Sequence, residues 1–256
     1  MFGGQSYEHE ISCMSLRNIY LNIDKEKYDV SVCGIDKEGI WYIVNDIESV
    51  NGSWNLFSTK IDNISSYLKS FDIVFPVMNG FPLESGDIIG LFNTLGVKYV
   101  GSGSIENGIS YDKEVTKLLT STKGINVTPY KVVFNEKEID NLDIDYPVII
   151  KPSKCGSSIG IYKCNNYEEL KNSIKESFKY DNKVLIEKFI HAKELECGVL
   201  IDKASIVGEI IPHNEFYDYD SKYVLDSNIL IPADINESLM TEIRETSLKI
   251  FKILGC

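Results

Sequence analysis

The stretch from Val148 to Cys164, VIIKPSKCGSSIGIYKC, places a lysine, two hydroxyl groups and two glycines between two apolar runs. Glycine lets a ligand come close to the backbone, and hydroxyl and N–H groups donate to phosphate oxygens. The stretch therefore allows two interpretations, a hairpin turn or a flap over the phosphates of a nucleotide. It is not a Walker motif, which needs G-x-x-x-x-G-K-[ST] before a helix, whereas strands are expected on both sides here.

Lysines from two other places favour the nucleotide interpretation. Lys113 begins an expected helix and Lys151 ends the strand before the glycine loop. A single lysine at a strand end is usually a solvated rim residue, but about two cations suit a polyphosphate. Glu187 and Lys188 follow a further apolar run. They are either an ordinary charge pair at a strand end or groups that face an adenine amine.

Two further stretches carry reactive side chains. In GGQSYEHEIS, Glu8 and Glu10 precede an expected helix. Either they complement the positive end of the helix dipole, or one carboxylate holds an ammonium group. The aromatic stretch FYDYDSKY, residues 216–223, is either a packed Ω-loop or a lid in which Lys222 reaches a transferring phosphoryl group.

The composition limits the class of protein. The 256 residues are 43% hydrophobic and 25% charged, with a net charge of −12, which is typical of a soluble globular chain without a nucleic-acid surface. We find neither a membrane-spanning run nor a signal peptide in the sequence. The six cysteines form no C-x-x-C pair and do not cluster with histidines. We therefore expect reduced thiols, no zinc site and a cytoplasmic location.

The apolar patterns indicate an α/β chain. The first part resembles a doubly wound sheet, whose ligands lie outside the carboxyl ends of the strands. Its expected helices cover 11–23 and 87–96, and its expected strands cover 28–35, 40–44, 71–77 and 97–104. Further on we expect helices at 110–124, 166–180 and 236–255, and strands at 128–134, 146–153, 157–164, 182–190, 193–201 and 204–212. Both ends look abrupt, because only Met1 and Phe2 precede the turn at Gly3-Gly4 that should follow a first strand, and the chain stops one residue after Gly255, where another strand would be expected.

Seven stretches occur in order along essentially the whole chain: FGGQSYEHEIS, VFPVMNGFPLESGDIIGLF, YVGSG, DKEVTK, VIIKPSKCGSSIGI, LIEKFIHAKELECGVL and FYDYDSKY. Together they resemble the D-alanine–D-alanine ligases of the ATP-grasp superfamily. The resemblance implies an α/β (α+β) fold in which an N-terminal doubly wound parallel-sheet domain, 1–104, is followed by an ATP-grasp fold. The central ATP-grasp lobe would cover 105–188, and the C-terminal lobe, 189–256, would be incomplete.

The resemblance also implies a reaction. ATP would phosphorylate the carboxylate of one D-alanine, and the amine of a second D-alanine would attack the acyl phosphate. The dipeptide would feed peptidoglycan synthesis. Catalysis of this kind depends mainly on positioning and on neutralising charge on the transferring oxygens. By analogy with the family, we expect a cytoplasmic homodimer that binds neither nucleic acid nor membrane.

The resemblance assigns the roles of the family's functional residues to the residues at matching positions of this chain. Glu8 matches the acid that grips the ammonium group of the first D-alanine. Ser157 and Tyr223 match the hydrogen-bonding partners that link the glycine loop and the lid to that acid. Lys222 matches the lid lysine near the transferred phosphate. The SKY form of the lid is similar to that of members that add D-alanine.

The resemblance also assigns nucleotide-binding roles to residues of this chain. Lys113 and Lys151 match the lysines on the α and β phosphates, and Ser157 and Ser158 are the loop hydroxyls that would donate to phosphate. The adenine and ribose pocket matches Glu187, Lys188, Ile190 and Glu194.

The chain also departs from the family. Asn79-Gly80 stands where histidine-glycine is usual. In the family, a strand bearing an arginine and an aspartate, then a Glu-x-Asn motif, follow the position of Cys256, and these bind Mg²⁺ and stabilise the oxyanion. We therefore expect the Mg²⁺ ligands beyond the end of this chain and none within it.

Three hypotheses follow. The first is a D-alanine–D-alanine ligase, and the second is a truncated, catalytically impaired homologue that only binds nucleotide or a D-amino acid. The third, motivated by Asn79, is an ATP-grasp enzyme that joins other small substrates.

Overall fold

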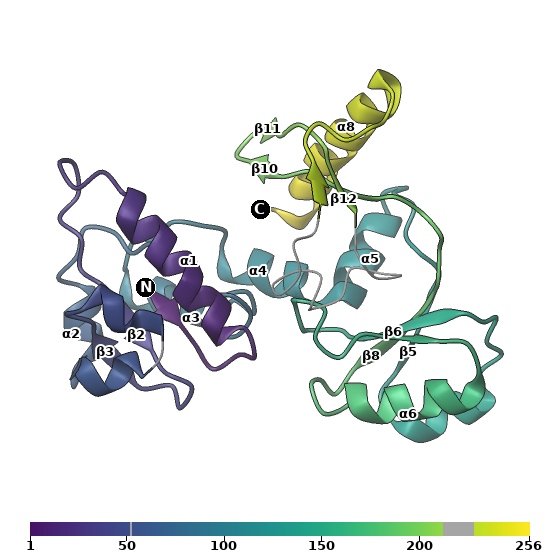
Figure 1. Cartoon of the computed structure of the whole chain (residues 1–256), viewed down its shortest axis with the longest axis horizontal. Helices are drawn as coiled ribbons and strands as arrows, with labels where there is room; N and C mark the ends of the chain where they lie inside the picture. The colour runs from purple at the N-terminus through teal and green to yellow at the C-terminus, as the bar shows by residue number, and fades with distance from the viewer. Residues whose placement is uncertain (52, 212–227) are drawn as a thin grey trace. The chain divides into compact units, whose positions relative to one another are not determined.

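The structure, a computed structural model, describes residues 1–51, 53–211 and 228–256. These residues form two compact units, Met1–Gly108 and Ile109–Cys256. Figure 1 colours both units along the chain, and each is described below by itself.

The first unit is built on a mixed sheet with the strand order β1-β2-β3-β4, in which β1 and β2 pair in parallel and the other pairs are antiparallel. The elements are β1 (Phe2–Gly3), α1 (His9–Asn22), β2 (Cys33–Ile35), β3 (Trp41–Ile43), the 3-10 helices η1 (Ile47–Asn51) and η2 (Trp54–Phe57), β4 (Thr59–Lys60), α2 (Ile64–Leu68), α3 (Asp87–Leu95) and α4 (Ser104–Tyr111), whose end reaches the second unit.

The apolar segment 71–77 forms no regular strand, contrary to our expectation. It makes one isolated parallel bridge, between Val74 and Tyr99. Its backbone is nevertheless satisfied on both sides. Val77 N–H donates to Met1 O at 2.7 Å, and Val74 N–H donates to Lys98 O at 2.8 Å. The segment therefore extends the parallel part of the sheet beyond β1, as a doubly wound domain requires.

Two apolar clusters fill the first unit on either side of its sheet. One centres on the fully buried Phe92 and Ile89 of α3. The other packs Leu16 of α1 against Phe2 and Trp54. The clusters fix α1 and α3, and with them the turns that precede each helix.

The second unit contains the antiparallel sheet β5-β8-β6-β7. Helix α6 packs on β6 and β7, as Figure 1 shows, and its Leu170 and Ile174 join Ile150 and Ile186 in the core. The elements of this part are α5 (Lys113–Ser121), β5 (Tyr130–Val133), the 3-10 helix η3 (Glu136–Asn141), β6 (Val148–Pro152), β7 (Tyr162–Cys164), α6 (Tyr167–Ser177) and β8 (Val184–Lys188).

The register of this sheet decides which side chains share a face. Tyr130 pairs with Glu187, and Lys151 pairs with Leu185, two residues away from Glu187. Because side chains alternate along a strand and paired residues point the same way, Tyr130, Lys151 and Glu187 share one face. Ile150 and Ile186, which contact α6, lie on the other. The face away from α6 therefore carries Lys151 and Glu187.

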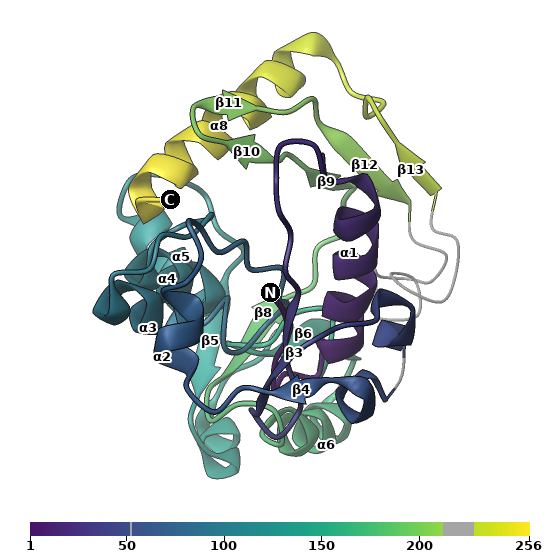
Figure 2. The ribbon, with the colours of Figure 1, turned by 90° about the vertical axis from the view of Figure 1, so that its left-hand side faces the viewer.

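The rest of the second unit is a small sheet, a hairpin and a long helix. The sheet has the order β13-β12-β9 and is antiparallel. Figure 2 shows α8 beside the β10–β11 hairpin. The elements are β9 (Glu194–Glu196), β10 (Val199–Leu200), β11 (Lys203–Ala204), β12 (Gly208–Ile211), β13 (Asn228–Leu230) and α8 (Glu237–Leu254).

Candidate functional site

The start of α5 is fixed by a cap that also joins it to the sheet. Asp112 is the N-cap, and its Oδ1 accepts the N–H of Val115 at 3.3 Å and the hydroxyl of Ser153 at 2.7 Å. Ser153 directly follows β6, so one carboxylate ties the helix to the strand that ends at the glycine loop. Lys113, the first residue of α5, is thereby held next to that loop.

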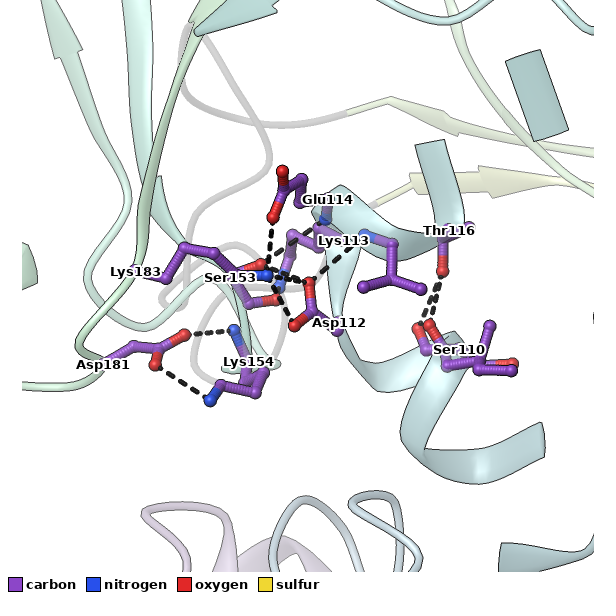
Figure 3. A network of polar contacts seen from close by, with 11 residues as sticks. Ser110, Asp112, Lys113, Glu114, Thr116, Ser153, Lys154, Asp181 and Lys183 are labelled. Atoms are coloured by element: carbon purple, nitrogen blue, oxygen red, sulfur yellow. Dashed lines mark hydrogen bonds and ion pairs between the residues drawn. The ribbon is translucent and has the colours of Figure 1, made fainter. Parts of the chain in front are cut away.

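Figure 3 shows the ionic network around this cap. Lys183, which directly precedes β8, donates to both carboxylate oxygens of Asp112, at 2.8 and 2.7 Å, and to Oε2 of Glu114 at 2.7 Å. Burial raises the pKa of Asp112, but the hydrogen bonds from Lys183 and Ser153 outweigh it, and the net pKa is lowered. Burial likewise works against the charged Lys183, yet its two carboxylate partners raise its pKa overall. Both groups are therefore charged at neutral pH.

Lys113 points to the base of the glycine loop. Its Nζ donates to the carbonyl oxygens of Ser153, at 3.2 Å, and Cys155, at 2.5 Å. Burial, and after it the nearby charge of Lys151, lower the pKa of Lys113. The like charge of Lys151 near Lys113 makes this part of the site favourable for an anion.

The glycine loop is anchored at its base and strained at its tip. Asp181 accepts the backbone N–H of Lys154 at 2.7 Å, and the hydroxyl of Ser177 donates to Gly160 O at 2.8 Å. At the tip, Ser157 and Ser158 both adopt left-handed conformations, with φ of 51° and 57°. Each such residue costs on the order of 1 kcal/mol, and strain of this kind collects at ligand sites.

Glu187 lies on the same face of the sheet and is buried, with 5% of its surface exposed. Its Oε2 is 2.5 Å from Lys151 Nζ, and its Oε1 is 3.0 Å from Lys117 Nζ. The ammonium group of Lys117 is close to Oε1 but is not oriented to donate a hydrogen bond to it. Within the described ranges, Oε1 therefore has no hydrogen-bond donor. A buried carboxylate oxygen without a donor is costly and needs an explanation.

An adenine nucleotide fits this arrangement. The unsatisfied Oε1 of Glu187 is an acceptor for an exocyclic amine, and Lys113 and Lys151 supply positive charge for phosphates. The base of the glycine loop lies beside Lys113, whose Nζ donates to Ser153 O and Cys155 O, so the N–H and hydroxyl groups of the loop are available for phosphates near this lysine. The second unit therefore brings together five of the expected nucleotide-binding residues: Lys113, Lys151, Ser157 and Ser158 of the glycine loop, and Glu187.

Three other expected residues lie apart from this group. Lys188 is on the opposite face of β8, where its Nζ is 3.3 Å from Asp145. Its side chain lines a 200 Å³ cavity on that face, together with Val148 and Ile186. Ile190 is 52% exposed beyond the end of β8, and Glu194 is an exposed residue of β9.

Glu8, in the first unit, is buried at 5% exposure and is the N-cap residue of α1. Its N–H donates to Ser6 Oγ at 3.1 Å, and that hydroxyl donates to Asn79 O at 2.7 Å. Gly80 has φ of 69°, and a Cβ there would lie 2.9 Å from Oε2 of Glu8. The turn at Asn79-Gly80 thus carries a glycine where the carboxylate comes closest. Glu10, by contrast, forms an exposed pair with Lys37.

His9 is part of the support for this turn. Its Nδ1 is 2.7 Å from Gly4 O, and its Nε2 is 3.4 Å from Nε1 of Trp54. The indole N–H only donates, so Nε2 is the acceptor and the proton is on Nδ1. His9 is therefore fully occupied in holding the loop before Glu8.

Lys222 and Tyr223, expected in the lid, lie outside the described residues. Within the described ranges, no group of three or more His, Cys, Asp or Glu side chains could hold a metal ion. All six cysteines are free thiols. No helix among the described residues is long and apolar enough to cross a membrane.

Sequence reasoning missed Lys117, Lys183 and Ser153. Lys117 lies four residues after Lys113, so both occupy one face of α5, and this spacing was the available signal. Lys183 lies 71 residues from Asp112 in the chain, and no local pattern connects them.

Comparison with known proteins defines the class. The family model described as "D-ala D-ala ligase N-terminus" matches residues 1–102, and "D-ala D-ala ligase C-terminus" matches residues 119–256. A D-alanine–D-alanine ligase from Acetivibrio thermocellus is 40% identical over 100% of this chain and 79% of the relative. D-alanine–D-alanine ligase B from Clostridium tetani is also 40% identical, over 100% of this chain and 76% of the relative.

Comparison with solved structures leads to the same family. The VanG D-Ala:D-Ser ligase from Enterococcus faecalis superposes with a TM-score of 0.84 at 32% identity, covering 100% of this chain and 81% of that one. The D-alanine–D-alanine ligase from Coxiella burnetii gives 0.81 at 27% identity, with 100% and 76% covered. The α/β fold is thus that of an ATP-grasp ligase. The chain belongs to the D-alanine–D-alanine ligase family.

Proposed function

We propose that this chain is an ATP-dependent ligase that joins two D-alanines into D-alanyl-D-alanine for peptidoglycan synthesis. Membership of the family supports the reaction class. The observation that carries the nucleotide part is the buried Oε1 of Glu187, which lacks a hydrogen-bond donor among the described residues, on a face shared with Lys151. Identity of 40% along the whole chain does not favour the second hypothesis, a homologue that only binds.

In this proposal the second unit handles the nucleotide. Lys113 and Lys151 neutralise the α and β phosphates, and Ser157 and Ser158 close over them. Glu187 accepts the adenine amine, and the family match assigns Lys188, Ile190 and Glu194 to the adenine and ribose pocket, where Lys188 would contribute its backbone because its side chain lies on the opposite face of β8. Ser177 and Asp181 hold the base of the loop, so closing needs movement only at its strained tip.

The amino-acid end of the reaction is assigned to Glu8, Ser157, Lys222 and Tyr223. Glu8 pairs with the ammonium group of the first D-alanine, and Ser157 and Tyr223 connect it to the loop and the lid. The γ-phosphoryl group of ATP passes to the carboxylate, beside Lys222, and gives ADP and an acyl phosphate. The amine of the second D-alanine then attacks the carbonyl carbon, a proton leaves the nitrogen, and phosphate departs.

The remaining assignments rest on the family. We propose ATP with Mg²⁺ as the nucleotide form, a homodimer and a cytoplasmic location. Among the described residues, no group of three or more His, Cys, Asp or Glu side chains is arranged to hold Mg²⁺. We also propose the division into domains 1–104, 105–188 and 189–256.

A product assay tests this function. The chain is incubated with ATP, Mg²⁺ and D-alanine, and ADP, phosphate and dipeptide are quantified. We expect the three products in equal amounts, and no ADP without D-alanine. Nucleotide binding without dipeptide would instead support the binding-only homologue.

A second amino acid is worth including in that assay. One structural relative is a D-Ala:D-Ser ligase, and Asn79 departs from the usual histidine next to Glu8. Parallel reactions with D-serine and D-lactate added to D-alanine would identify the second substrate. Predominance of D-alanyl-D-serine would replace the proposed product with that dipeptide.

Glu8→Gln is expected to raise the KM for the first D-alanine about 30-fold or more, with little change in the KM for ATP. The amide keeps the shape but removes the charge that pairs with the ammonium group, and hydrogen-bonded charge pairs are worth about 2–5 kcal/mol. Steady-state kinetics over a range of D-alanine concentrations measure the effect. Glu10→Gln, next to it on the exposed surface, is the matched control and should leave both constants unchanged.

A further inference from the structure

Glu187 has two cationic neighbours, and the proposed function uses only one of them. Lys151 lies on Oε2 and Lys117 lies 3.0 Å from Oε1. When a nucleotide binds, Lys151 is the lysine that the proposed function assigns to phosphate. Lys117 would then be the cation that stays with the buried carboxylate.

Lys117 is held in place by groups other than Glu187. Its Nζ donates to Thr128 O at 3.3 Å and lies 5.3 Å above the centre of the Tyr130 ring, within the range of a cation–π contact. Its side chain is only 15% exposed. Because Tyr130 and Glu187 are paired across β5 and β8, the ammonium group sits above the sheet face that carries the carboxylate.

The geometry of Oε1 limits what Lys117 can do there. The ammonium group stabilises the negative charge at 3.0 Å, yet it does not fill the hydrogen-bonding position of Oε1. An ionised carboxylate only accepts hydrogen bonds, whereas a protonated carboxyl group also donates. A cation that holds the charge and leaves the acceptor open therefore selects a ligand that donates.

We propose that Lys117 is a specificity-determining residue that holds the Glu187 carboxylate in the orientation of a hydrogen-bond acceptor and so selects 6-aminopurine over 6-oxopurine nucleotides. The inference rests on the proposed function of the same site. Lys117 itself need not contact the nucleotide, so it acts as a positioning residue. Its four-residue spacing from Lys113 means that one face of α5 supplies a cation to the phosphates and another to the base-reading carboxylate.

ATP and inosine triphosphate (ITP) distinguish this role from simple support, because they share the triphosphate and differ at position 6. Binding of each is measured by titration calorimetry on the wild type, Lys117→Met, Lys117→Arg and the control Lys171→Met, which alters an exposed residue of α6. In the wild type and the control we expect a preference for ATP on the order of 10- to 100-fold, the effect of a buried acceptor facing a group that cannot donate. Lys117→Met is expected to lose most of this preference, mainly through weaker ATP binding, and Lys117→Arg to retain it.

The outcomes distinguish a failure of the proposed function from a failure of the role of Lys117. If the wild type binds neither nucleotide, the proposed function fails and the inference fails with it. If the wild type prefers ATP and Lys117→Met weakens ATP and ITP equally, or changes neither, the proposed function stands and the role of Lys117 is overturned. Circular dichroism spectra of the variants establish that each is folded before its binding is compared.

Discussion

Replacing Lys151 by methionine is expected to weaken ATP binding about 30-fold or more. The change removes a cation from the proposed phosphate site and also leaves Oε2 of the buried Glu187 without its partner at 2.5 Å. Truncating one member of a buried, hydrogen-bonded charge pair typically costs about 2–5 kcal/mol, and each 1.4 kcal/mol is a factor of about ten. Titration calorimetry with ATP measures the dissociation constant directly.

The control separates local from general effects of removing a lysine. Lys171→Met changes the net charge by the same amount on the exposed surface of α6. Its affinity for ATP should match the wild type. Lys151→Met with an ATP affinity within about threefold of the control would contradict the assignment of Lys151 to the nucleotide, since such a change is under 1 kcal/mol.

Replacing Lys183 by methionine is expected to destabilise the second unit by about 2–3 kcal/mol. Asp112 and Glu114 would keep their charges with 13% and 22% of their side chains exposed, and lose the one ammonium group that bridges them. Breaking a buried ion pair costs about 3–5 kcal/mol, and partial solvation reduces that figure. The cap of α5 would loosen as well, because Asp112 receives hydrogen bonds from both Lys183 and Ser153.

Hydrogen exchange measured by mass spectrometry reports the loss of stability within the second unit itself. Peptides from β6 and β8 should exchange faster by the factor that corresponds to the lost free energy. Both tryptophans, Trp41 and Trp54, lie in the first unit, so tryptophan fluorescence should show that unit unchanged. Lys179→Met, which breaks an exposed pair with Glu176, is the matched control and should leave the exchange unaltered. Equal exchange in Lys183→Met and in this control would refute the structural role of the network.

The same network predicts a dependence on pH. The pKa of Asp112 is lowered in the folded state, so its contribution is present above its unfolded value of about 3.9 and is lost as the pH falls through the folded value. The pKa of Lys183 is raised, so its contribution is complete below about 10.4 and is lost as the pH rises through the folded value. The stability difference between wild type and Lys183→Met should therefore be constant from about pH 5 to pH 10 and shrink outside that window.

Local features of the fold were predictable because they depend on neighbouring residues. Asp112 as the N-cap of α5 and Gly96 as the C-cap of α3 follow from residue type and were predicted, and both caps are present. The conformation of the segment 71–77 was harder to predict. Its apolar run predicts a strand, but the segment forms only one isolated bridge, between Val74 and Tyr99, and this pairing depends on a segment distant in the sequence.

For the site, resemblance to the family identified side chains but not their partners. Glu187 was placed in an adenine pocket from the sequence, yet its pairing with Lys117 and Lys151 depends on the register of β5, β8 and β6. Likewise, the opposite orientations of Glu187 and Lys188 follow from strand alternation once the pairing is known. Long-range register is the information that a single sequence lacks.

Protection of individual lysines by ATP tests the central claim, that Lys113, Lys151 and the glycine loop enclose one nucleotide. The protein is treated with an amine-reactive reagent with and without ATP and Mg²⁺, and modification of each lysine is quantified by peptide mass spectrometry. We expect ATP to slow modification of Lys113 and Lys151, while Lys171 reacts at an unchanged rate. Equal modification of Lys113 and Lys151 with and without a saturating concentration of ATP would contradict it.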